Sequence, residues 1–321
     1  MVTDTVCTEL HSMRLFPKSG GAADYCISGI AARCDWVLLS DYHAPKTHLL
    51  RTRTTETPRH IFLSMRNGFA ALVHFATHVL PQLRAPFVLV SGSEDLTLPK
   101  QCDARWRSYN AVERQAIADI LNHPLLLHWF AENLDDDSDP RFSPLPTGMV
   151  FPKGTPRKID PVCPLPLGDR PLQVLCGHRV RDGAQWDLRR QVTKQAQTTW
   201  APFCTIPDAD LPEAEFLTLM QSHAFVLCAE GGGLDPSPKA WQTILHGAIP
   251  IIRKTATYKA YNQLPVAFVE TWNPASLTPR TLADWHRSRL PFYDSPELRE
   301  QTLTRLTLGH WWHQISSRAR T

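Results

Sequence analysis

The sequence predicts an α/β protein with two Rossmann-like domains, and three observations lead to this class. Short apolar runs of strand length alternate along the chain with longer segments of helical spacing. Several of these runs end in polar or glycine-containing turns, which is typical of buried parallel strands. With 321 residues, the chain is long enough for about two domains of roughly 150 residues each.

In the first half of the chain, the runs 36–39 and 87–90 have the composition of buried parallel strands. A segment of helical spacing over 69–80 separates them. Each run leads into a polar segment, 40–43 after the first and 91–95 after the second. We therefore expect polar and titratable side chains at the carboxyl ends of these two strands.

The second half repeats the order of strand, helix and strand more clearly, with glycine-containing turns between the elements. This order is typical of a doubly wound parallel sheet. The expected strands are 172–176, 224–228, 249–252 and 266–269, and the expected helices are 185–198, 216–222, 238–246 and a short one near 258.

The predicted domain boundary lies where prolines gather. The chain has 27 prolines and only 15 glycines, which predicts many rigid connections and helix starts. Six of the prolines fall between 152 and 171, which is the composition of a linker. We therefore expect a first domain over 1–160 and a second domain over 161–295.

Charge, hydropathy and cysteine usage exclude several classes of protein. Lys and Arg number 34 and Asp and Glu 31, and the net charge of +3 is scattered, so a nucleic-acid binder is not expected. No apolar stretch approaches the ~18 residues of a membrane-spanning helix. The N-terminus lacks the basic start and apolar segment of a secretion signal. The eight cysteines form no CxxC pair, so neither a zinc ribbon nor a disulfide scaffold is expected. From these observations together we expect a soluble, cytoplasmic protein with reduced thiols.

The most informative turn follows the predicted strand 224–228. Three consecutive glycines, at 231–233, would let the backbone approach a ligand closely, and the helix that follows would offer its free N–H groups to an anion. Lys239 falls in the first turn of that helix, where a cation is unfavourable unless an anion lies beside it. Glu230 could accept hydrogen bonds from a ribose. The alternative is an ordinary loop, with Lys239 solvated and Glu230 capping the helix.

The stretch 225–252 resembles the nucleotide-sugar motif of GT-B glycosyltransferases, particularly the exostosin-like family. In that family a strand, an acidic or glycine-rich turn and a helix lead to a Gly-x-Ile-Pro-Ile strand, which is present here at 247–251. Glu230 and Lys239 also resemble the acidic turn and the Lys helix start of fucosyltransferases. The resemblance implies a nucleotide diphosphate donor, with UDP favoured, held by residues that include Gly231 and Gly232. This chain has Gln242 where many family members have Glu, and we expect its uncharged amide to hydrogen-bond a ribose hydroxyl of the donor.

Weaker similarity extends the match to roughly 85–275, with Trp129 to Asn133 and the turn 145–149 resembling the interdomain passage of these transferases. The resemblance implies a GT-B arrangement in which a cleft between the domains receives donor and acceptor. It also implies that a C-terminal helix over 296–317 packs back on the first domain, together with the remaining residues to 321. The motif of 225–252 is the specific part of the match.

The predicted site also needs cations and a base. Arg179 and Arg181 follow the strand 172–176 and could clamp the diphosphate in place of a metal ion. If the reaction inverts the anomeric centre, an acid of the first domain must accept the acceptor proton. We expect Asp95, with Glu94, in the catalytic role. The same residues could instead cap helices or bind the acceptor.

Three other patterns predict structure rather than chemistry. The DxD-like pairs at 135–137 and 208–210 lie in polar turns, where a solvated loop is the better interpretation. His310 and His313 have a spacing that could hold a metal, but the two tryptophans between them indicate a packing face.

Asp41 and His43 lie at a strand end, and we expect them to bind the acceptor.

The sequence therefore predicts a hexosyl- or pentosyltransferase that moves a sugar from a UDP-sugar to a hydroxyl of a glycan, without a metal or other cofactor. One alternative is a non-catalytic nucleotide-sugar or glycan-binding protein of the same fold. A second is an NAD-linked epimerase, which the missing GxGxxG disfavours. The sugar, the acceptor, the stereochemistry and the oligomeric state are left open.

Overall fold

The computed structural model describes residues 9–18, 20, 24–41, 47–53, 55–154, 158, 165–207, 211–236 and 238–319. It divides into two compact units. Unit 1 comprises Met1–Lys158, Gly233–Asp235 and Thr307–Thr321, and unit 2 comprises Ile159–Gly232 and Pro236–Leu306. Each unit contains one mainly or wholly parallel sheet with helices packed on it, so the predicted class of two Rossmann-like α/β domains is confirmed.

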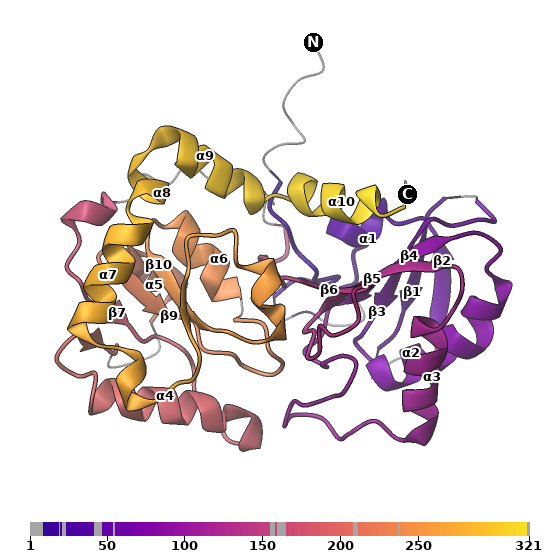
Figure 1. Cartoon of the computed structure of the whole chain (residues 1–321), viewed down its shortest axis with the longest axis horizontal. Coiled ribbons are helices and arrows are strands. Elements are labelled where there is room, and N and C mark those ends of the chain that lie inside the picture. The colour runs from indigo at the N-terminus through magenta and orange to yellow at the C-terminus, as the bar shows by residue number, and fades with distance from the viewer. Residues whose placement is uncertain are drawn as a thin grey trace, which may run out of the picture. The chain divides into compact units, whose positions relative to one another are not determined.

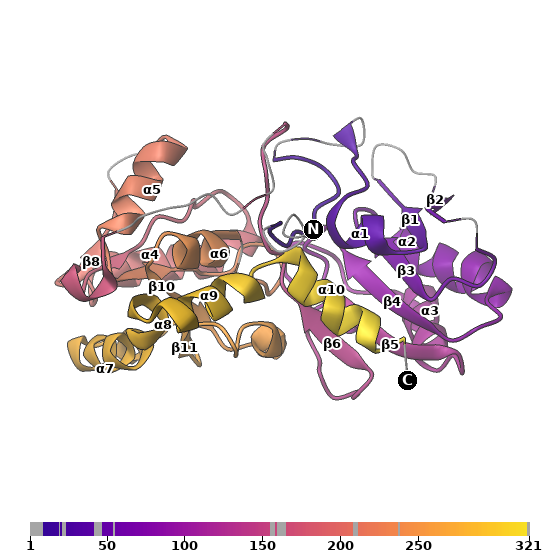
Figure 2. The ribbon, with the colours of Figure 1, turned by 90° about the horizontal axis from the view of Figure 1, so that it is seen from above.

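Unit 1 contains a six-stranded sheet whose parallel strands follow the chain in one direction across it, as Figure 2 shows. The order is β2-β1-β3-β4-β5-β6, and only the edge strand β2 is antiparallel to its neighbour. The strands are β1 (Trp36–Leu39), β2 (His48–Arg51), β3 (His60–Ser64), β4 (Phe87–Gly92), β5 (Leu126–Glu132) and β6 (Phe142–Leu145).

The helices of unit 1 include one with a clear sequence signal that our prediction missed. They are α1 (Gly29–Arg33), α2 (Gly68–His74) with the π-turn Phe75–Val79 and the 3-10 turn Leu80–Gln82, α3 (Ala111–Leu121) and α10 (Leu308–Ser317). At the start of α3, the Asn110 side chain accepts from the Glu113 N–H at 2.9 Å, and the Glu113 carboxylate accepts from the Asn110 N–H at 2.8 Å. This capping box, Asn-x-x-Glu, was readable in the sequence.

Unit 2 contains a five-stranded sheet whose strand order reverses. The order is β11-β10-β9-β7-β8, and every pairing is parallel. The chain goes from β7 outward to β8 and then returns to β9 on the other side of β7. The strands are β7 (Val174–Leu175), β8 (Cys204–Thr205), β9 (Phe225–Leu227), β10 (Ile249–Arg253) and β11 (Ala267–Val269). This reversal is the topological switch point of the sheet.

Prolines begin several helices of unit 2, as their abundance predicts. The last three helices follow one another as one group (Figure 2). The helices are α4 (Asp187–Gln197), α5 (Glu213–Gln221), α6 (Pro238–Leu245), α7 (Pro279–Arg289), α8 (Pro291–Asp294) and α9 (Pro296–Arg305), with 3-10 turns at Leu167–Asp169, Ala184–Trp186, Ala256–Ala260 and Pro274–Ser276. Each unit has its own apolar core, with Trp129 buried in unit 1 and Trp200 in unit 2.

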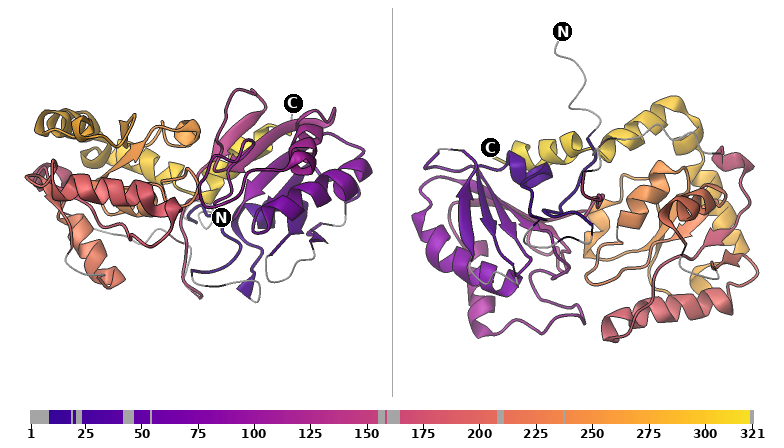
Figure 3. Two further views of the ribbon diagram at one scale, coloured as in Figure 1. Left: turned by 90° about the horizontal axis from the view of Figure 1, so that it is seen from below. Right: turned by 180° about the vertical axis from the view of Figure 1, so that it is seen from behind.

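The prediction of a single C-terminal helix packed on the first domain was wrong in part. The segment forms two helices, and only Thr307–Thr321, with α10, belongs to unit 1, where α10 lies beside α1 (Figures 1 and 3). The break has a local cause, because Thr307 is extended and its side chain accepts from the His310 N–H. The Leu308 N–H then donates to the Glu9 carbonyl at 2.7 Å.

The two units are not contiguous in the sequence. Gly233–Asp235 belong to unit 1, although the residues on both sides of them belong to unit 2. The predicted second domain over 161–295 therefore does not account for these three residues. Among the described residues, no helix has both the length and the apolar character needed to cross a lipid bilayer.

Candidate functional site

The switch point of unit 2 lies between β7 and β9, so the segments that leave these two strands lie at the same edge of the sheet. They are 176–181 after β7 and 228–232 after β9. In open parallel sheets, ligands bind outside the carboxyl ends of the strands at such a reversal. The topology thus selects the same edge that the glycine-rich turn indicates in the sequence.

Lys239 lies at this edge, in the first turn of α6, as the sequence predicts. Its Nζ donates to the Gly177 carbonyl at 2.7 Å and lies 5.2 Å from the centroid of the Phe216 ring. Burial lowers the pKa of Lys239 to about 8, and the positive charges of Arg189 and Arg179 lower it further. An ammonium group buried among other cations is stabilised when an anion binds beside it.

Arg189 of α4 is a second cation of this edge, and sequence reasoning missed it. Its guanidinium donates to the Glu230 carbonyl at 3.0 Å, to the Ala229 carbonyl at 3.2 Å and to the Arg179 carbonyl at 3.3 Å. It therefore spans the segments after β7 and β9. A Cβ at Gly231 would lie 3.0 Å from Nη2 of Arg189, so the glycine leaves room for this approach.

The carboxylate of Glu230 is buried and held on both oxygens. Nε of Arg253, the last residue of β10, donates to Oε1 at 2.5 Å, and Nε1 of Trp272 donates to Oε2 at 3.0 Å. These contacts place the carboxyl group between two donors of the protein. Arg253 directly follows the predicted strand 249–252, and that position at a strand end was the available signal for it.

The other predicted donor residues lie on or near the same edge. Arg179 and Arg181 are exposed in the segment after β7, and the Arg181 guanidinium lies 5.9 Å from the Trp186 ring centroid. Gly231 and Gly232 are half-buried. Gln242 is turned to another partner, because its amide donates to the Glu213 carboxylate of α5 at 3.4 Å.

The neighbouring titratable groups add no charge at neutral pH. Burial lowers the pKa of His178 to about 3 and raises the pKa of Cys176 to about 11 and of Cys228 to about 12. The imidazole and both thiols are therefore neutral near pH 7. The charge at this edge comes from the cations and from Glu230.

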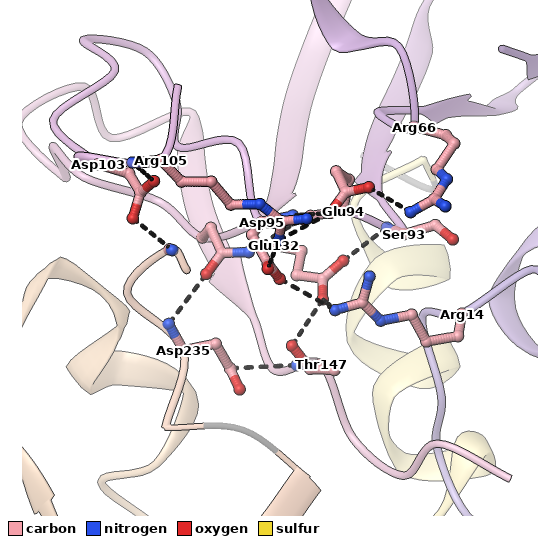
Figure 4. A network of polar contacts seen from close by, with 12 residues as sticks. Arg14, Arg66, Ser93, Glu94, Asp95, Asp103, Arg105, Glu132, Thr147 and Asp235 are labelled. Carbon is pink, nitrogen blue, oxygen red and sulfur yellow. Dashed lines mark hydrogen bonds and ion pairs between the residues drawn. The ribbon is translucent and has the colours of Figure 1, made fainter. Parts of the chain in front are cut away.

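In unit 1, the predicted base Asp95 follows β4 and lies between two arginines (Figure 4). Its carboxylate accepts from Arg14 at 3.1 Å and from Arg105 at 2.5 Å. Its side chain is 20% exposed, whereas that of Glu94 is 2% exposed. Of the two predicted acids, Asp95 is therefore the one that a substrate can reach.

Glu94 and Asp41 continue this ion-pair network across the strand ends. Glu94 accepts from Nη1 of Arg66 at 2.6 Å, and Nε of Arg66 lies 3.7 Å from Asp41. Asp41 is buried and also accepts from the Tyr25 hydroxyl at 3.3 Å. The network alternates acids and arginines along the carboxyl edge of the sheet. His43, predicted to bind the acceptor with Asp41, lies outside the described residues.

Glu132, at the end of β5, is a further acid of this edge that sequence reasoning missed. Its two oxygens accept from the Ser93 N–H at 2.5 Å and from the Thr147 hydroxyl at 2.6 Å, and Nη2 of Arg14 lies 3.8 Å away. Burial raises its pKa to about 7, and the negative charges of Asp235 and Asp95 contribute. The sequence signal was its position at the end of an apolar run, beside Asn133.

The last glycine of the triplet has a structural role in unit 1. Gly233 has φ +83°, and a Cβ there would lie 2.5 Å from Oδ1 of Asn133. Asn133 also accepts from the Leu234 and Asp235 N–H groups, both at 2.9 Å. Asp103 accepts from the Gly233 N–H at 2.6 Å. Gly233 is therefore explained by the docking of Gly233–Asp235 onto unit 1.

The remaining patterns are structural where they are described. Asp135 accepts from the Thr97 hydroxyl and the Lys100 N–H, so it fixes a turn, and His310 contacts Gln314 and the Trp311 ring. Asp208 and Asp210 lie outside the described residues. In the part of the chain that the structure describes, no group of three or more His, Cys, Asp or Glu could hold a metal ion.

The solved structures that match this chain include two of one protein, and their similarity to this chain is limited. Spinosyn rhamnosyltransferase SpnG matches with 10% identity and a TM-score of 0.31, over 82% of this chain and 71% of that chain. The same protein complexed with thymidine diphosphate matches with 11% identity, the same TM-score and the same coverage. No protein-family model and no curated protein matches the sequence.

Proposed function

We propose that the protein is a GT-B glycosyltransferase that uses a nucleotide diphosphate sugar, with the donor bound at the switch point of unit 2. The observation that carries this proposal is Lys239, a half-buried cation at the start of α6 whose Nζ reaches the segment after β7. Arg189 spans the segments after β7 and β9. Two cations at a ligand-binding edge favour an anionic ligand such as a diphosphate.

The proposed chemistry assigns the acid to unit 1 and the leaving group to unit 2. The acceptor hydroxyl oxygen attacks the anomeric carbon of the sugar while the bond to the diphosphate oxygen breaks. The proton goes to a carboxylate, for which Asp95 is the best exposed candidate. The electron pair stays on the diphosphate, where Lys239 and Arg189 stabilise the added charge. The proposal involves no metal ion, and turnover in the presence of a chelator tests that part.

Calorimetric titration with UDP, TDP, GDP and CMP tests the donor site. We expect a uridine or thymidine diphosphate to bind and Lys239→Met to weaken its binding by about 10- to 100-fold, because charge-assisted hydrogen bonds contribute roughly 1.5–3 kcal/mol each. Lys254→Met is the matched control, because Lys254 is 45% exposed and lies near Glu270. The proposal fails if no nucleotide binds, or if Lys239→Met binds as tightly as the unchanged protein.

A non-catalytic nucleotide-sugar-binding protein is the second candidate function. The observation that favours it is the pairing of Asp95 with both Arg14 and Arg105, which occupies the carboxylate that should accept a proton. Release of free nucleotide from UDP-sugars in the presence of glycan acceptors separates the two functions. Turnover that falls by about a hundredfold or more in Asp95→Asn supports the transferase. Binding without any turnover supports the binding protein.

A further inference from the structure

The guanidinium of Arg253 is anchored at one nitrogen and open at the other two. Nε donates to the buried Glu230 carboxylate at 2.5 Å. Within the described part of the chain, no residue accepts a hydrogen bond from its Nη1 or Nη2. The side chain is 30% exposed. Four N–H donors of a fixed, planar group therefore face no protein acceptor.

Two other arginines of unit 2, the buried Arg170 and the half-buried Arg189, differ from this arrangement. Arg170 uses all three of its nitrogens, donating to the carbonyls of Leu165, His223 and His246. Arg189 likewise donates to carbonyls from Nε, Nη1 and Nη2. These two side chains hold the backbone together. Arg253 is also anchored at Nε, but by the Glu230 carboxylate, and its Nη1 and Nη2 hold no carbonyl of the described residues.

Glu230 holds this fork in place, and a second residue holds Glu230. Trp272, itself buried, donates from Nε1 to Oε2 at 3.0 Å, while Oε1 accepts from Arg253. The carboxylate is thus fixed in one orientation and directs Arg253 from the end of β10. Arg189 contacts the carbonyl of the same Glu230 residue, so both guanidinium groups lie beside the end of β9.

We propose that Arg253 binds a phosphate group of the ligand at the switch point and that Glu230 is its positioning residue rather than a ribose contact. This inference rests on the proposed function, because it adds a third cation to the donor site of Lys239 and Arg189. A planar fork with free Nη donors matches two phosphate oxygens, which a single ammonium group does not.

Inorganic pyrophosphate and UDP are the two probes that test the inference, because only UDP contains a ribose. The variants are Arg253→Lys, Glu230→Gln and the double variant. Arg253→Lys keeps a cation beside Glu230, whereas an uncharged residue there would leave a buried carboxylate without its partner. Arg287→Lys is the matched control, since Arg287 of α7 is 77% exposed and pairs with Asp284. Thermal melting shows that each variant is folded.

We expect Arg253→Lys to weaken both probes about tenfold, and Glu230→Gln to weaken both by a similar factor. The double variant should be no weaker than Arg253→Lys, because the two residues act as a unit. Arg287→Lys should bind both probes as the unchanged protein does. This pattern supports the inference, since pyrophosphate offers no ribose for Glu230 to contact.

Three results overturn it. If Arg253→Lys binds pyrophosphate within twofold of the unchanged protein while Lys239→Met does not bind it, Arg253 is structural and the proposed function stands. If Glu230→Gln weakens UDP but not pyrophosphate, Glu230 contacts the ribose. If the unchanged protein binds neither probe, the proposed function and this inference fail together.

Discussion

In unit 1, the arginines at the carboxyl edge of the sheet pair with acids, whereas in unit 2 the cations at the corresponding edge bind mainly backbone carbonyls. Arg14 and Arg66 lie against Asp95 and Glu94. Lys239 and Arg189 donate to carbonyl oxygens instead. Carbonyls fix the position of a cation without cancelling its charge. The comparison indicates that unit 1 neutralises its charges internally and that unit 2 leaves the charges of Lys239 and Arg189 without an acidic partner among these contacts.

The strongest test of this comparison in unit 1 is the pH dependence of stability through Glu132. Its pKa is about 7 in the folded protein, against an ordinary value of 4.5. Between these values the folded state binds more protons than the unfolded state, so the free energy of unfolding falls as pH rises, by at most about 3 kcal/mol. Glu132→Gln should remove this decline in urea unfolding measured from pH 4.5 to 8.

Glu113 is the matched control for that experiment. The hydrogen bonds from Arg107 lower its pKa, and burial opposes them. Its contribution to stability is therefore present above the unfolded-state pKa and is lost as pH falls, which is the opposite sign. If Glu132→Gln keeps the decline of the unchanged protein between pH 4.5 and 7, the carboxyl group at the end of β5 is not the cause.

In unit 2, the corresponding test is the pH dependence of UDP affinity through Lys239. With a pKa of about 8, Lys239 loses its proton as pH rises above that value, and it is charged below it. UDP affinity should fall by up to about tenfold per pH unit above 8, because each unit of deprotonation costs about 1.4 kcal/mol. Calorimetry from pH 7 to 9.5 measures this slope. Lys239→Met should bind weakly with little slope, and an equal slope in both proteins contradicts the assignment.

The docking of Gly233–Asp235 predicts a smaller effect on unit 1. Gly233→Ala should lower the free energy of unfolding by about 2 kcal/mol or more, because it combines a positive φ with a close contact to Asn133. Gly154→Ala should cost only about 1 kcal/mol, since Gly154 also has a positive φ but nothing lies within 4 Å of its added Cβ. Urea denaturation of the two variants compares them directly. Equal losses of unfolding free energy in the two variants would show that the contact between the added Cβ and Asn133 does not affect stability.

The smallest expected effect concerns Arg105, the most exposed arginine of the unit 1 network. Its guanidinium contacts Asp95 at 2.5 Å and is 34% exposed, so the pair is partly screened by solvent. Arg105→Gln should lower the free energy of unfolding by less than about 1 kcal/mol, and the loss should be smaller still at high salt. A larger loss that salt does not reduce would show that unit 1 depends on this charge more strongly than the comparison indicates.

Much of the fold was predictable because burial and local signals act over short stretches of chain. The strands near 36–39, 87–90 and 249–252 and the helix start at Pro238 were all predicted from apolar runs and from proline. The capping box of α3 was readable but missed. Strands β2, β3, β5, β6 and β8 were not predicted. Strand β2 is mostly exposed and β8 has only two residues, but β3 is a buried apolar run that the prediction missed.

The candidate site was predictable only in part, for a different reason. The sequence placed Lys239 at a helix start and Asp95 at a strand end, since both are local positions. It did not reveal Arg189 or Arg253, whose partners are 41 and 23 residues away along the chain. Polar residues on a helix or at a strand end are common, and nothing local distinguishes the ones that converge.

The sequence by itself determined the α/β class, the parallel strands and the glycine-rich turn, because each depends on the order and polarity of neighbouring residues. Only the tertiary structure decided which charges are cancelled and which remain. Asp95 meets Arg14 from 81 positions earlier, and Glu230 meets Arg253 and Trp272 rather than solvent. The energy of a charge depends on its distance to other charges and on its burial, and both are set by packing between distant segments.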